Sequence, residues 1–316
     1  MSARILDGTA IANGIRADLK PDVAALVAQG IKPGLAVVIV GEDPASQVYV
    51  ASKGKACLEA GMHSETIRLP ATTTEAELLA VVDRLNADRA IHGFLVQLPV
   101  PKHISSERVL LRIDPTKDVD GFHPMNVGRL SVGDQQAFRP ATPYGIQQML
   151  IRSGIETKGA HAVIIGRSNI VGKPMASLLV QDTPGGNATV TICHSRSRDL
   201  PGLARMADIL VVAIGKPEFV TAEMVKPGAV VVDVGINRVA DPTAAKGYRI
   251  VGDVAFEPVS QVASWITPVP GGVGKMTIAM LLLNAVQAAK QGGRAGRREG
   301  GQTDRRTDGQ TDRGHG

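Results

Sequence analysis

The chain has 316 residues, of which 44% are hydrophobic and only 3% aromatic, so it is long enough for two domains with aliphatic cores. Much of the formal net charge of +5 lies after residue 291, and no basic stripe is interleaved with aromatic residues, which argues against nucleic-acid binding. Two widely separated cysteines, no apolar leader and no bilayer-length apolar run predict a cytoplasmic protein with reduced thiols and no membrane segment.

Strands and helices alternate in the first half of the chain. Apolar residues at helical spacing predict a helix over 7–29, which ends at Gly30. Strands are then predicted over 35–40, 65–69 and 91–99, and helices over 45–60, 75–86 and 104–113. This alternation predicts a parallel sheet with crossover helices.

Two stretches of this first half are candidate sites. Tyr49 and Lys53 lie four residues apart in the helix after the first strand, so they share one helix face. An aromatic platform beside an amine can hold a flat substrate and move a proton, although such a pair alone is more often a surface lysine lying along a tyrosine. The charged loop over 114–121 separates two apolar regions, so it is either a site or a solvated connection.

A second α/β unit follows a helix predicted over 142–152. Its strands are predicted over 161–166, 189–193, 209–214, 230–234 and 249–251, with a helix over 174–180. A last helix over 277–290 is so apolar that we expect it to be buried, against the first domain. From residue 291 onward, Gly, Arg, Asp, Thr and Gln dominate and Gln-Thr-Asp-Arg recurs, which predicts disorder and no catalytic role.

The turn after the strand at 161–166 has the ingredients of a dinucleotide site. Its sequence, GRSNIVGKP, departs from G-x-G-x-x-G at Ser168 but keeps glycines for a tight turn and a helix N-terminus for a pyrophosphate. The next strand ends without the acidic residue that an NAD enzyme uses for the ribose. Ser195 and Arg196 there, with Arg167, suit a 2′-phosphate, so we predict NADP rather than NAD. Alternatively, Arg196 and Arg198 are solvated loop charges.

The loop over 266–277, ITPVPGGVGKMT, is not a phosphate-binding Walker A loop, because Val269 and Met276 replace the required Gly and Ser or Thr. Its prolines and glycines instead predict a shaped loop where backbone approaches a ligand closely. The chain shows no Ser-His-Asp order with a nucleophile elbow and no metal-ligand spacing of His, Cys and carboxylates. We therefore expect no catalytic metal.

Five segments in chain order resemble the signatures of the bifunctional methylenetetrahydrofolate dehydrogenase/methenyltetrahydrofolate cyclohydrolase family. They are YVASKGK at 49–55, GFLVQLPVP at 93–101, KDVDG at 117–121, GRSNIVGKP at 166–174 and TPVPGGVG at 267–274. The resemblance spans about residues 3–290 and implies an α/β protein whose two domains flank a cleft. It implies a folate-binding catalytic domain over 1–141 completed by the helix 274–290, a Rossmann-like parallel sheet binding NADP over 142–273, and a tail over 291–316.

The resemblance also implies the chemistry. The chain would oxidise 5,10-methylenetetrahydrofolate with NADP and hydrolyse the methenyl product to 10-formyltetrahydrofolate in the same cleft, as a homodimer. Lys53 would be the catalytic lysine of hydrolysis beside Gln97, with Tyr49 packed on the folate and Asp120 holding the pterin. The implied folate-binding residues are Tyr49, Val50, Lys53, Gln97, Leu98, Pro99, Asp120, Pro268, Gly271 and Gly272. The cofactor residues are Gly166, Ser168, Val171, Gly172, Ser195, Gly235 and Ile236, to which charge adds Arg167 and Arg196.

Three positions depart from the family pattern. Ala141 stands where many members have cysteine, Ala255 where an acidic residue is frequent, and Lys275 where proline is usual. Lys275 adds a positive charge near the folate cleft and could alter folate affinity. Two other functions stay open: an NADP-dependent dehydrogenase acting on another small carbonyl or hydroxy acid, and a folate- or NADP-binding protein that has lost turnover.

Overall fold

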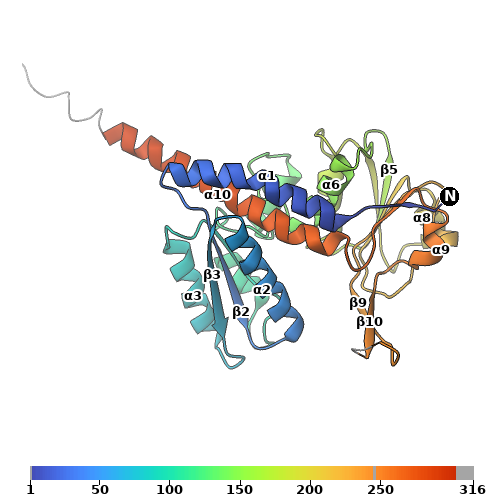
Figure 1. Cartoon of the computed structure of the whole chain (residues 1–316), viewed down its shortest axis with the longest axis horizontal. Coiled ribbons are helices and arrows are strands. Elements are labelled where there is room, and N and C mark those ends of the chain that lie inside the picture. Colours follow the sequence, from blue (N-terminus) through green and yellow to red (C-terminus); the bar gives the residue numbers. More distant parts are fainter. Residues whose placement is uncertain (1, 245–246, 304–316) are drawn as a thin grey trace, which may run out of the picture.

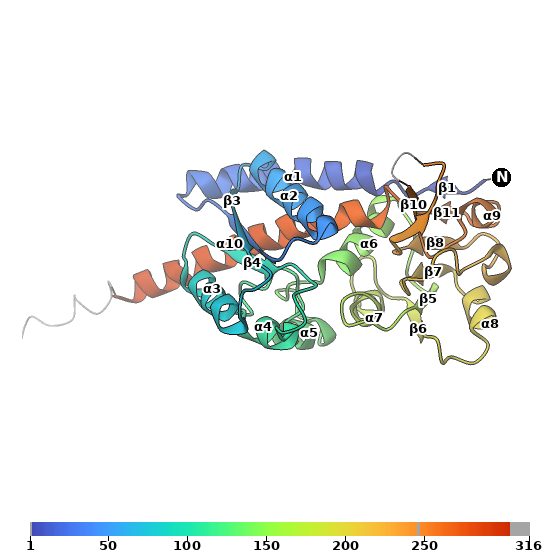
Figure 2. The ribbon, with the colours of Figure 1, turned by 90° about the horizontal axis from the view of Figure 1, so that it is seen from below.

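The computed structural model describes residues 2–244 and 247–303, which form two α/β domains (Figure 1). Helices α1 (Gly8–Ala28) and α10 (Val273–Thr303) lie side by side along the long axis and connect the two domains. The turned view in Figure 2 shows the same pairing, with the helix α6 (Ala141–Arg152) beside α10 where the domains meet. The predicted α/β architecture with two domains is confirmed.

The first domain is built on a parallel three-stranded sheet in the order β3-β2-β4. Its strands are β2 (Gly34–Val40), β3 (His63–Leu69) and β4 (Gly93–Val96), and its helices are α2 (Pro44–Glu59), α3 (Glu75–Ala87), α4 (Ser106–Arg112) and α5 (Pro124–Ser131). Every residue of the central strand β2 is buried, as expected for a parallel strand covered on both faces. Local signals start the helices: Asp43 caps α2, and Thr74 forms a capping box with Glu77 at α3.

The charged loop over 117–121 runs along the free edge of β4. The Phe94 N–H donates to the Lys117 carbonyl at 2.9 Å, and Phe94 and Asp118 form an isolated parallel bridge. A Cβ added at Gly93 would lie 2.0 Å from Val119 Cγ1, so the loop can come this close only beside glycine. The loop therefore continues the sheet and is fixed at its edge.

The second domain has six parallel strands in the order β1-β11-β8-β7-β5-β6. They are β1 (Arg4–Ile5), β5 (His161–Ile165), β6 (Thr189–Cys193), β7 (Ile209–Val212), β8 (Val230–Asp233) and β11 (Trp265–Ile266). Its further helices are α7 (Gly172–Val180), α8 (Leu200–Arg205), α9 (Phe256–Ser260) and the 3₁₀ turn η1 (Ala222–Met224).

Two sequence predictions for this domain need correction. The strand at 249–251 does not join the large sheet: β10 (Tyr248–Val251) pairs with β9 (Asn237–Ala240), in an antiparallel hairpin that projects from the domain (Figure 1). The first residues do not belong to the first domain, because β1 is an edge strand of the second domain's sheet. Two-residue strands such as β1 and β11 show no periodic pattern, so the sequence does not predict them.

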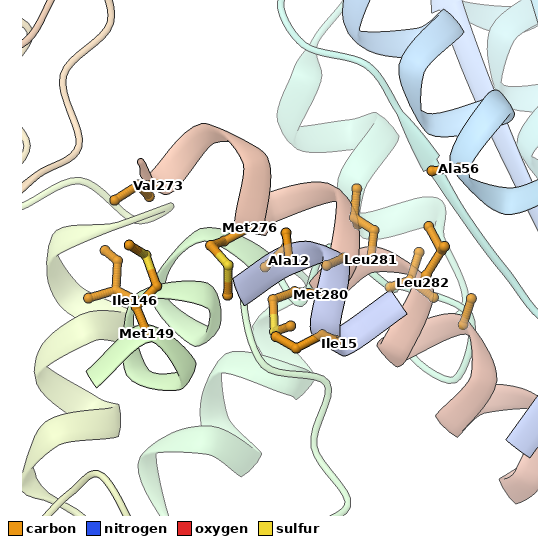
Figure 3. Packing of buried hydrophobic residues seen from close by; sticks show 14 of the residues in the cluster. Ala12, Ile15, Ala56, Ile146, Met149, Val273, Met276, Met280, Leu281 and Leu282 are labelled. Atoms are coloured by element: carbon orange, nitrogen blue, oxygen red, sulfur yellow. The ribbon is translucent and has the colours of Figure 1, made fainter. Parts of the chain in front are cut away.

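The predicted burial of the last helix is confirmed, and the helix contacts both domains. In Figure 3, Met276 and Met280 of α10 lie between Ile15 of α1 and the α6 residues Ile146 and Met149, and all five side chains are buried in one cluster. This shared core joins the domains. It also positions Val273, the first residue of α10, at the end of the glycine-rich loop.

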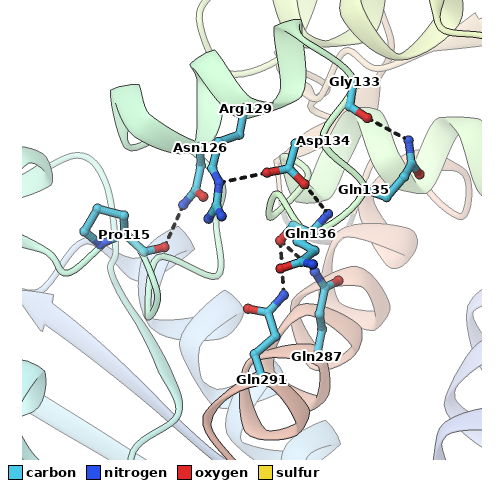
Figure 4. A network of polar contacts seen from close by, with 9 residues as sticks. All are labelled: Pro115, Asn126, Arg129, Gly133, Asp134, Gln135, Gln136, Gln287 and Gln291. Atoms are coloured by element: carbon cyan, nitrogen blue, oxygen red, sulfur yellow. Dashed lines mark hydrogen bonds and ion pairs between the residues drawn. The ribbon is translucent and has the colours of Figure 1, made fainter. Parts of the chain in front are cut away.

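Helix α10 continues past Lys290 to Thr303, whereas the sequence predicts disorder from residue 291 onward. Once a helix is nucleated, each further residue adds a hydrogen bond without a new nucleation cost, which offsets a poor composition. The side-chain amides of Gln287 and Gln291 also donate to the Gln136 carbonyl at 3.1 Å each (Figure 4). The prediction for 304–316 lies outside the described residues. Within the described part of the chain, no helix is long and apolar enough to cross a membrane.

Candidate active site

Lys53 and Gln97 meet at one edge of the first sheet. Helix α2 follows β2, Gln97 follows β4, and the Gln97 N–H still donates to the Val38 carbonyl at 2.8 Å, so both side chains lie near the carboxyl ends of parallel strands. The Lys53 ammonium donates to Gln97 Oε1 at 2.9 Å, and Gln97 Nε2 donates to the Leu98 carbonyl at 2.8 Å. Lys53 is only 6% exposed, so the alternative of a surface lysine is wrong.

Burial sets the charge states around Lys53. It lowers the pKa of Lys53, and the nearby Asp120 carboxylate opposes that shift. Burial raises the pKa of Asp120 to about 6, against the attraction of Lys53 and with a smaller contribution from Asp118. The site therefore pairs an amine whose pKa is lowered with a carboxyl group whose pKa is raised, a combination that is frequent in active sites.

The loop that carries Asp120 is held from several sides. Asp118, 1% exposed, accepts hydrogen bonds from the His123 N–H at 2.8 Å and from Asn126 Nδ2 at 3.0 Å. Asn284 of α10 donates to the Val119 carbonyl at 2.7 Å. Helix α10 thereby reaches the loop as well as the core, so the position of Asp120 depends on the joint between the domains.

The neighbouring candidate residues differ in their access to a ligand. Leu98 is 43% exposed, and the exposed Pro99 follows it through a cis peptide bond. Val50 is fully buried in the core, so its side chain is unavailable to a ligand, contrary to the sequence expectation. The reason is helical geometry, because the residue after Tyr49 points about 100° away from it, towards the sheet.

Residues of both domains line a cavity of about 280 Å³ that includes Tyr49. Tyr49 is 38% exposed, and partial burial raises the pKa of its hydroxyl group. Tyr49 Oη and Ile236 Cδ1 lie 3.7 and 3.4 Å from the position that a Cβ would take on Gly274, so both side chains face the start of α10. The sequence candidates that line this cavity are Tyr49, Gly235, Ile236, Pro268, Gly271 and Gly272.

The start of α1 holds the glycine-rich wall of this cavity. The Thr9 N–H and hydroxyl group donate to the Gly271 carbonyl at 3.1 and 3.2 Å, and the Gly272 N–H donates to the Pro268 carbonyl at 2.8 Å. A Cβ added at Gly8 would lie 2.1 Å from the Gly272 carbonyl oxygen. Glycine is therefore required at position 8 for the helix to pack against the loop.

A second cavity, of about 910 Å³, also lies between the domains. Leu98 and Asp120 line it from the first domain, and Ile170 and Lys173 from the second. We call the two cavities together the interdomain cleft. Among the described residues, no group of three or more His, Cys, Asp or Glu side chains is arranged to hold a metal ion.

The turn after β5 has the close backbone contacts that the sequence predicts. Gly166 has a φ of 138°, and a Cβ there would lie 2.3 Å from the Ala213 carbonyl oxygen. A Cβ at Gly172 would lie 2.2 Å from the Gly166 carbonyl oxygen. Ser168 Oγ accepts from the Val171 N–H at 3.1 Å and from the Gly172 N–H at 3.4 Å, which fixes the start of α7. At both positions a side chain would overlap a backbone carbonyl oxygen, so the turn requires glycine there.

The basic candidates lie beside this turn. The Gly166 N–H donates to the Cys193 carbonyl at 2.9 Å, so the loop after β6 is adjacent to the turn. Arg167, Ser195 and Arg196 are exposed, and the Arg196 N–H donates to His194 Nδ1 at 3.2 Å. These three residues lie outside the linings of the two cavities, on the surface next to the glycine turn.

Sequence reasoning missed two buried aspartates that shape the neighbouring strand ends. The Asp253 carboxylate accepts from the backbone N–H groups of Ile214, Gly215 and Lys216 at 2.7 to 2.9 Å. The Asp233 carboxylate accepts from the N–H groups of Gly235, Asp253 and Val254 at 2.9 Å each, and burial raises its pKa to about 6. The signals in the sequence were an aspartate at the end of an apolar strand, Asp233, and a second aspartate two residues after a strand, Asp253 in Gly-Asp-Val at 252–254.

These features define a two-domain α/β protein with a dinucleotide-type glycine turn on one side of a cleft and a buried lysine on the other. The family models for the catalytic domain and the NAD(P)-binding domain of tetrahydrofolate dehydrogenase/cyclohydrolase match residues 6–120 and 140–292. The chain therefore belongs to the tetrahydrofolate dehydrogenase/cyclohydrolase family.

Relatives of known name agree with this assignment. The chain is 57% identical to the bifunctional protein FolD 1 of Myxococcus xanthus, over 92% of this chain and 98% of that protein. It resembles the crystal structure of the bifunctional dehydrogenase/cyclohydrolase FolD from Campylobacter jejuni with a TM-score of 0.86 and 49% identity, over 92% and 99% of the two chains. A Trypanosoma brucei FolD structure in complex with NADP and an inhibitor matches with a TM-score of 0.87 and 40% identity, over 93% and 99%.

Proposed function

We propose that the chain oxidises 5,10-methylenetetrahydrofolate with NADP to 5,10-methenyltetrahydrofolate and hydrolyses that product to 10-formyltetrahydrofolate in the interdomain cleft. Family membership and the bifunctional relatives support both activities. The observation that carries the proposal is the buried Lys53, which is hydrogen-bonded to Gln97 and lies close enough to Asp120 to feel its charge.

The cofactor residues proposed from the sequence fit NADP. Gly166 and Gly172 let the turn pack closely against the Ala213 carbonyl and against itself, and Ser168 and Val171 start the helix whose N-terminus suits a pyrophosphate. When bound, NADP supplies the acceptor for the hydride. Arg167, Ser195 and Arg196 surround the end of β6, where their charges and hydroxyl group suit a 2′-phosphate.

The folate residues line the path from the lysine to the second domain. Tyr49 offers an aromatic face to the folate, and Asp120 accepts hydrogen bonds from the pterin. Leu98, between Gln97 and Pro99, lines the larger cavity, and Pro268, Gly271 and Gly272 line the smaller one. Gly235 and Ile236 line the same cavity as Tyr49, so cofactor and substrate groups face a common space. Oxidation requires chiefly this alignment, since hydride transfer needs no protein nucleophile.

Hydrolysis uses Lys53 as the base. Burial already lowers the pKa of Lys53, and the positive charge of the methenyl substrate would lower it further. Neutral Lys53 takes a proton from the attacking water while the water oxygen bonds to the methenyl carbon. The bond from that carbon to N5 then breaks as Lys53 passes its proton to N5. The hydroxyl group of the adduct releases its own proton to solvent and becomes the carbonyl oxygen of the formyl group on N10. Gln97 Oε1 holds the amine in place throughout.

We further propose a catalytic domain that ends at residue 141 and is completed by α10, and an NADP domain over 142–273 that also includes β1. The family matches over 6–120 and 140–292 support the boundary near residue 141, and the sheet order supports the place of β1. The second match includes the first part of α10, which contacts both domains. The two free, buried cysteines are compatible with the proposed cytoplasmic location. A homodimer is proposed from the family resemblance.

The deciding assay follows NADPH and methenyltetrahydrofolate by absorbance, using purified protein, methylenetetrahydrofolate and saturating NADP. We expect both activities in the wild type, and loss of hydrolysis with retained oxidation in Lys53→Met, which keeps the length of the side chain without its amine. A parallel series with NAD tests the cofactor. No signal in either channel would exclude the proposal, and turnover of a small hydroxy acid instead would favour the other dehydrogenase function.

A further inference from the structure

An apolar side chain of the second domain, Ile236, lines the cavity of about 280 Å³ directly before strand β9. Its Cδ1 atom and Tyr49 Oη lie 3.4 and 3.7 Å from the position that a Cβ would take on Gly274. Ile236 and Tyr49 thus come from different domains and approach the same point at the start of α10. Because the side chain of Ile236 is 53% exposed, packing alone holds it weakly, and its place depends on the backbone around it.

Two carboxylates hold the backbone on either side of Ile236. On one side, the Gly235 N–H donates to Asp233 Oδ1 at 2.9 Å. On the other side, Asn237 Nδ2 donates to Asp253 Oδ1 at 2.8 Å. A Cβ added at Gly235 would lie 2.4 Å from that same Asp253 oxygen, so the backbone packs directly on the carboxylate. The segment 235–237 is therefore fixed at both ends, and the side chain of its middle residue faces the cavity.

The two carboxylates belong to one buried network. Asp233 is 3% exposed and Asp253 is fully buried, and the Asp253 N–H donates to Asp233 Oδ1 at 2.9 Å. The backbone N–H groups at 214–216, after β7, donate to Asp253, and the Asp233 N–H donates to Thr267 Oγ1 at 2.7 Å. Thr267 precedes Pro268 of the glycine-rich loop. A buried polar network with its bonds formed is rigid, so it provides a firm base for the hairpin.

Asn237 differs from the other donors of this network because it acts through its side chain. The Asp253 carboxylate keeps its three backbone N–H donors when the Asn237 amide is removed, so a substitution at 237 leaves those N–H groups paired. The backbone of Asn237 lies opposite Val251 in the hairpin, and a different side chain does not alter that pairing. A hydrogen bond to a carboxylate is stronger than one between neutral groups. This single bond therefore joins the base of the hairpin to the network.

We propose that Asn237 is a positioning residue for the oxidation step: by binding Asp253 it holds Ile236 at the place where folate and cofactor must be aligned. This inference rests on the proposed function, which assigns Ile236 to the cofactor and Tyr49 to the folate. Asn237 lies outside the linings of both cavities, so it acts through Ile236. Hydride transfer depends on alignment of the two reactants, whereas hydrolysis does not use the cofactor.

The first test compares both activities in Asn237→Ala and Asn237→Asp. We expect Asn237→Ala to lower dehydrogenase kcat about tenfold, less than the roughly 100-fold that a fixed displacement of about 1 Å can cost. Hydrolysis of added methenyltetrahydrofolate should stay within about twofold of the wild type, because a lost interaction slows only the step that uses it. Asn237→Asp keeps the size of the side chain but presents an acceptor to Asp253, so it should lose at least as much dehydrogenase activity.

An isotope effect tests alignment directly. With methylenetetrahydrofolate deuterated at its methylene carbon, the isotope effect on dehydrogenase kcat should be larger in Asn237→Ala than in the wild type, because hydride transfer becomes the slower step. A variant that merely contains less folded enzyme would lower both activities equally and leave the isotope effect unchanged. That pattern would overturn the inference.

Hydrogen exchange of the protein alone gives a readout that needs neither cofactor nor turnover. Backbone amides of β9 and β10 should exchange faster in Asn237→Ala, while those of β5 and β7 should not change. Arg238→Met is the matched control in the same hairpin. Arg238 is exposed, its guanidinium lies 5.0 Å from the centre of the Tyr248 ring, and it lines neither cavity, so this variant should keep wild-type kinetics.

The outcomes separate this inference from the proposed function. Wild-type dehydrogenase kcat in Asn237→Ala, or the same loss in Arg238→Met, would overturn the role of Asn237 while both wild-type activities remain. A loss confined to hydrolysis would also overturn it. A wild type without either activity would instead refute the proposed function, and hydrogen exchange would still show whether Asn237 holds the hairpin.

Discussion

Replacing Gly8 with alanine tests how the glycine-rich wall of the folate cavity is held. The new Cβ would lie 2.1 Å from the Gly272 carbonyl oxygen, although real Cβ contacts essentially never fall below 3.0 Å. The loop and the start of α1 must then separate by about 1 Å. A misplacement of this size can cost about 100-fold in rate when it moves groups that position a substrate.

We therefore expect Gly8→Ala to lower kcat/KM for methylenetetrahydrofolate about 10- to 100-fold. The measurement is the initial rate of NADPH formation over a range of folate concentrations, with circular dichroism to verify folding. Hydrolysis of added methenyltetrahydrofolate should fall as well, because both reactions use the same cavity wall.

Gly14→Ala is the control in the same helix. A Cβ at Gly14 would lie 3.8 Å from Arg152 Nη1, an ordinary van der Waals contact. Alanine in a helix interior is about 0.5–1 kcal/mol more stable than glycine, so this variant should melt at a slightly higher temperature with unchanged kinetics. Wild-type kcat/KM in Gly8→Ala, or an equal loss in Gly14→Ala, would refute the reasoning.

Three further predictions follow from the buried polar groups. The rate of hydrolysis should rise with pH as Lys53 loses its proton. Asp120→Asn should move that rise to lower pH, because it removes the anion that raises the pKa of Lys53. A pH–rate profile that stays in place or moves to higher pH would contradict this coupling. Asp253→Asn should raise KM for NADP and lower the free energy of unfolding, measured by urea denaturation, by about 1.5–3 kcal/mol. The reason is that the backbone N–H groups after β7 lose a charged acceptor. If neither KM nor the free energy of unfolding changes, Asp253 does not have this role. Asn284→Leu should slow hydrolysis more than it changes KM for NADP, since Asn284 holds the Asp120 loop and not the cofactor turn; the opposite ratio would count against it.

Local sequence patterns were sufficient for much of the fold and for the chemistry of the site. Alternating apolar strands and amphipathic helices predicted both parallel sheets, because burial on both faces demands continuous apolar strands such as β2. The glycines at 166 and 172 indicated a turn in which backbone segments pack closely, because a side chain at either position would overlap a carbonyl oxygen. Tyr49 and Lys53 share a face by helical periodicity alone.

Tertiary structure decided what depends on partners distant in the chain. Local pattern does not reveal that β1 joins the second sheet, since a two-residue strand is defined only by its neighbour. The burial of Val50 and the bonds made by Asp253 likewise depend on which elements pack around them. The same holds for Lys53, whose proton affinity is set by burial and by Asp120 from a remote loop. Sequence therefore determined which groups are present, and packing determined their environment and hence their charge.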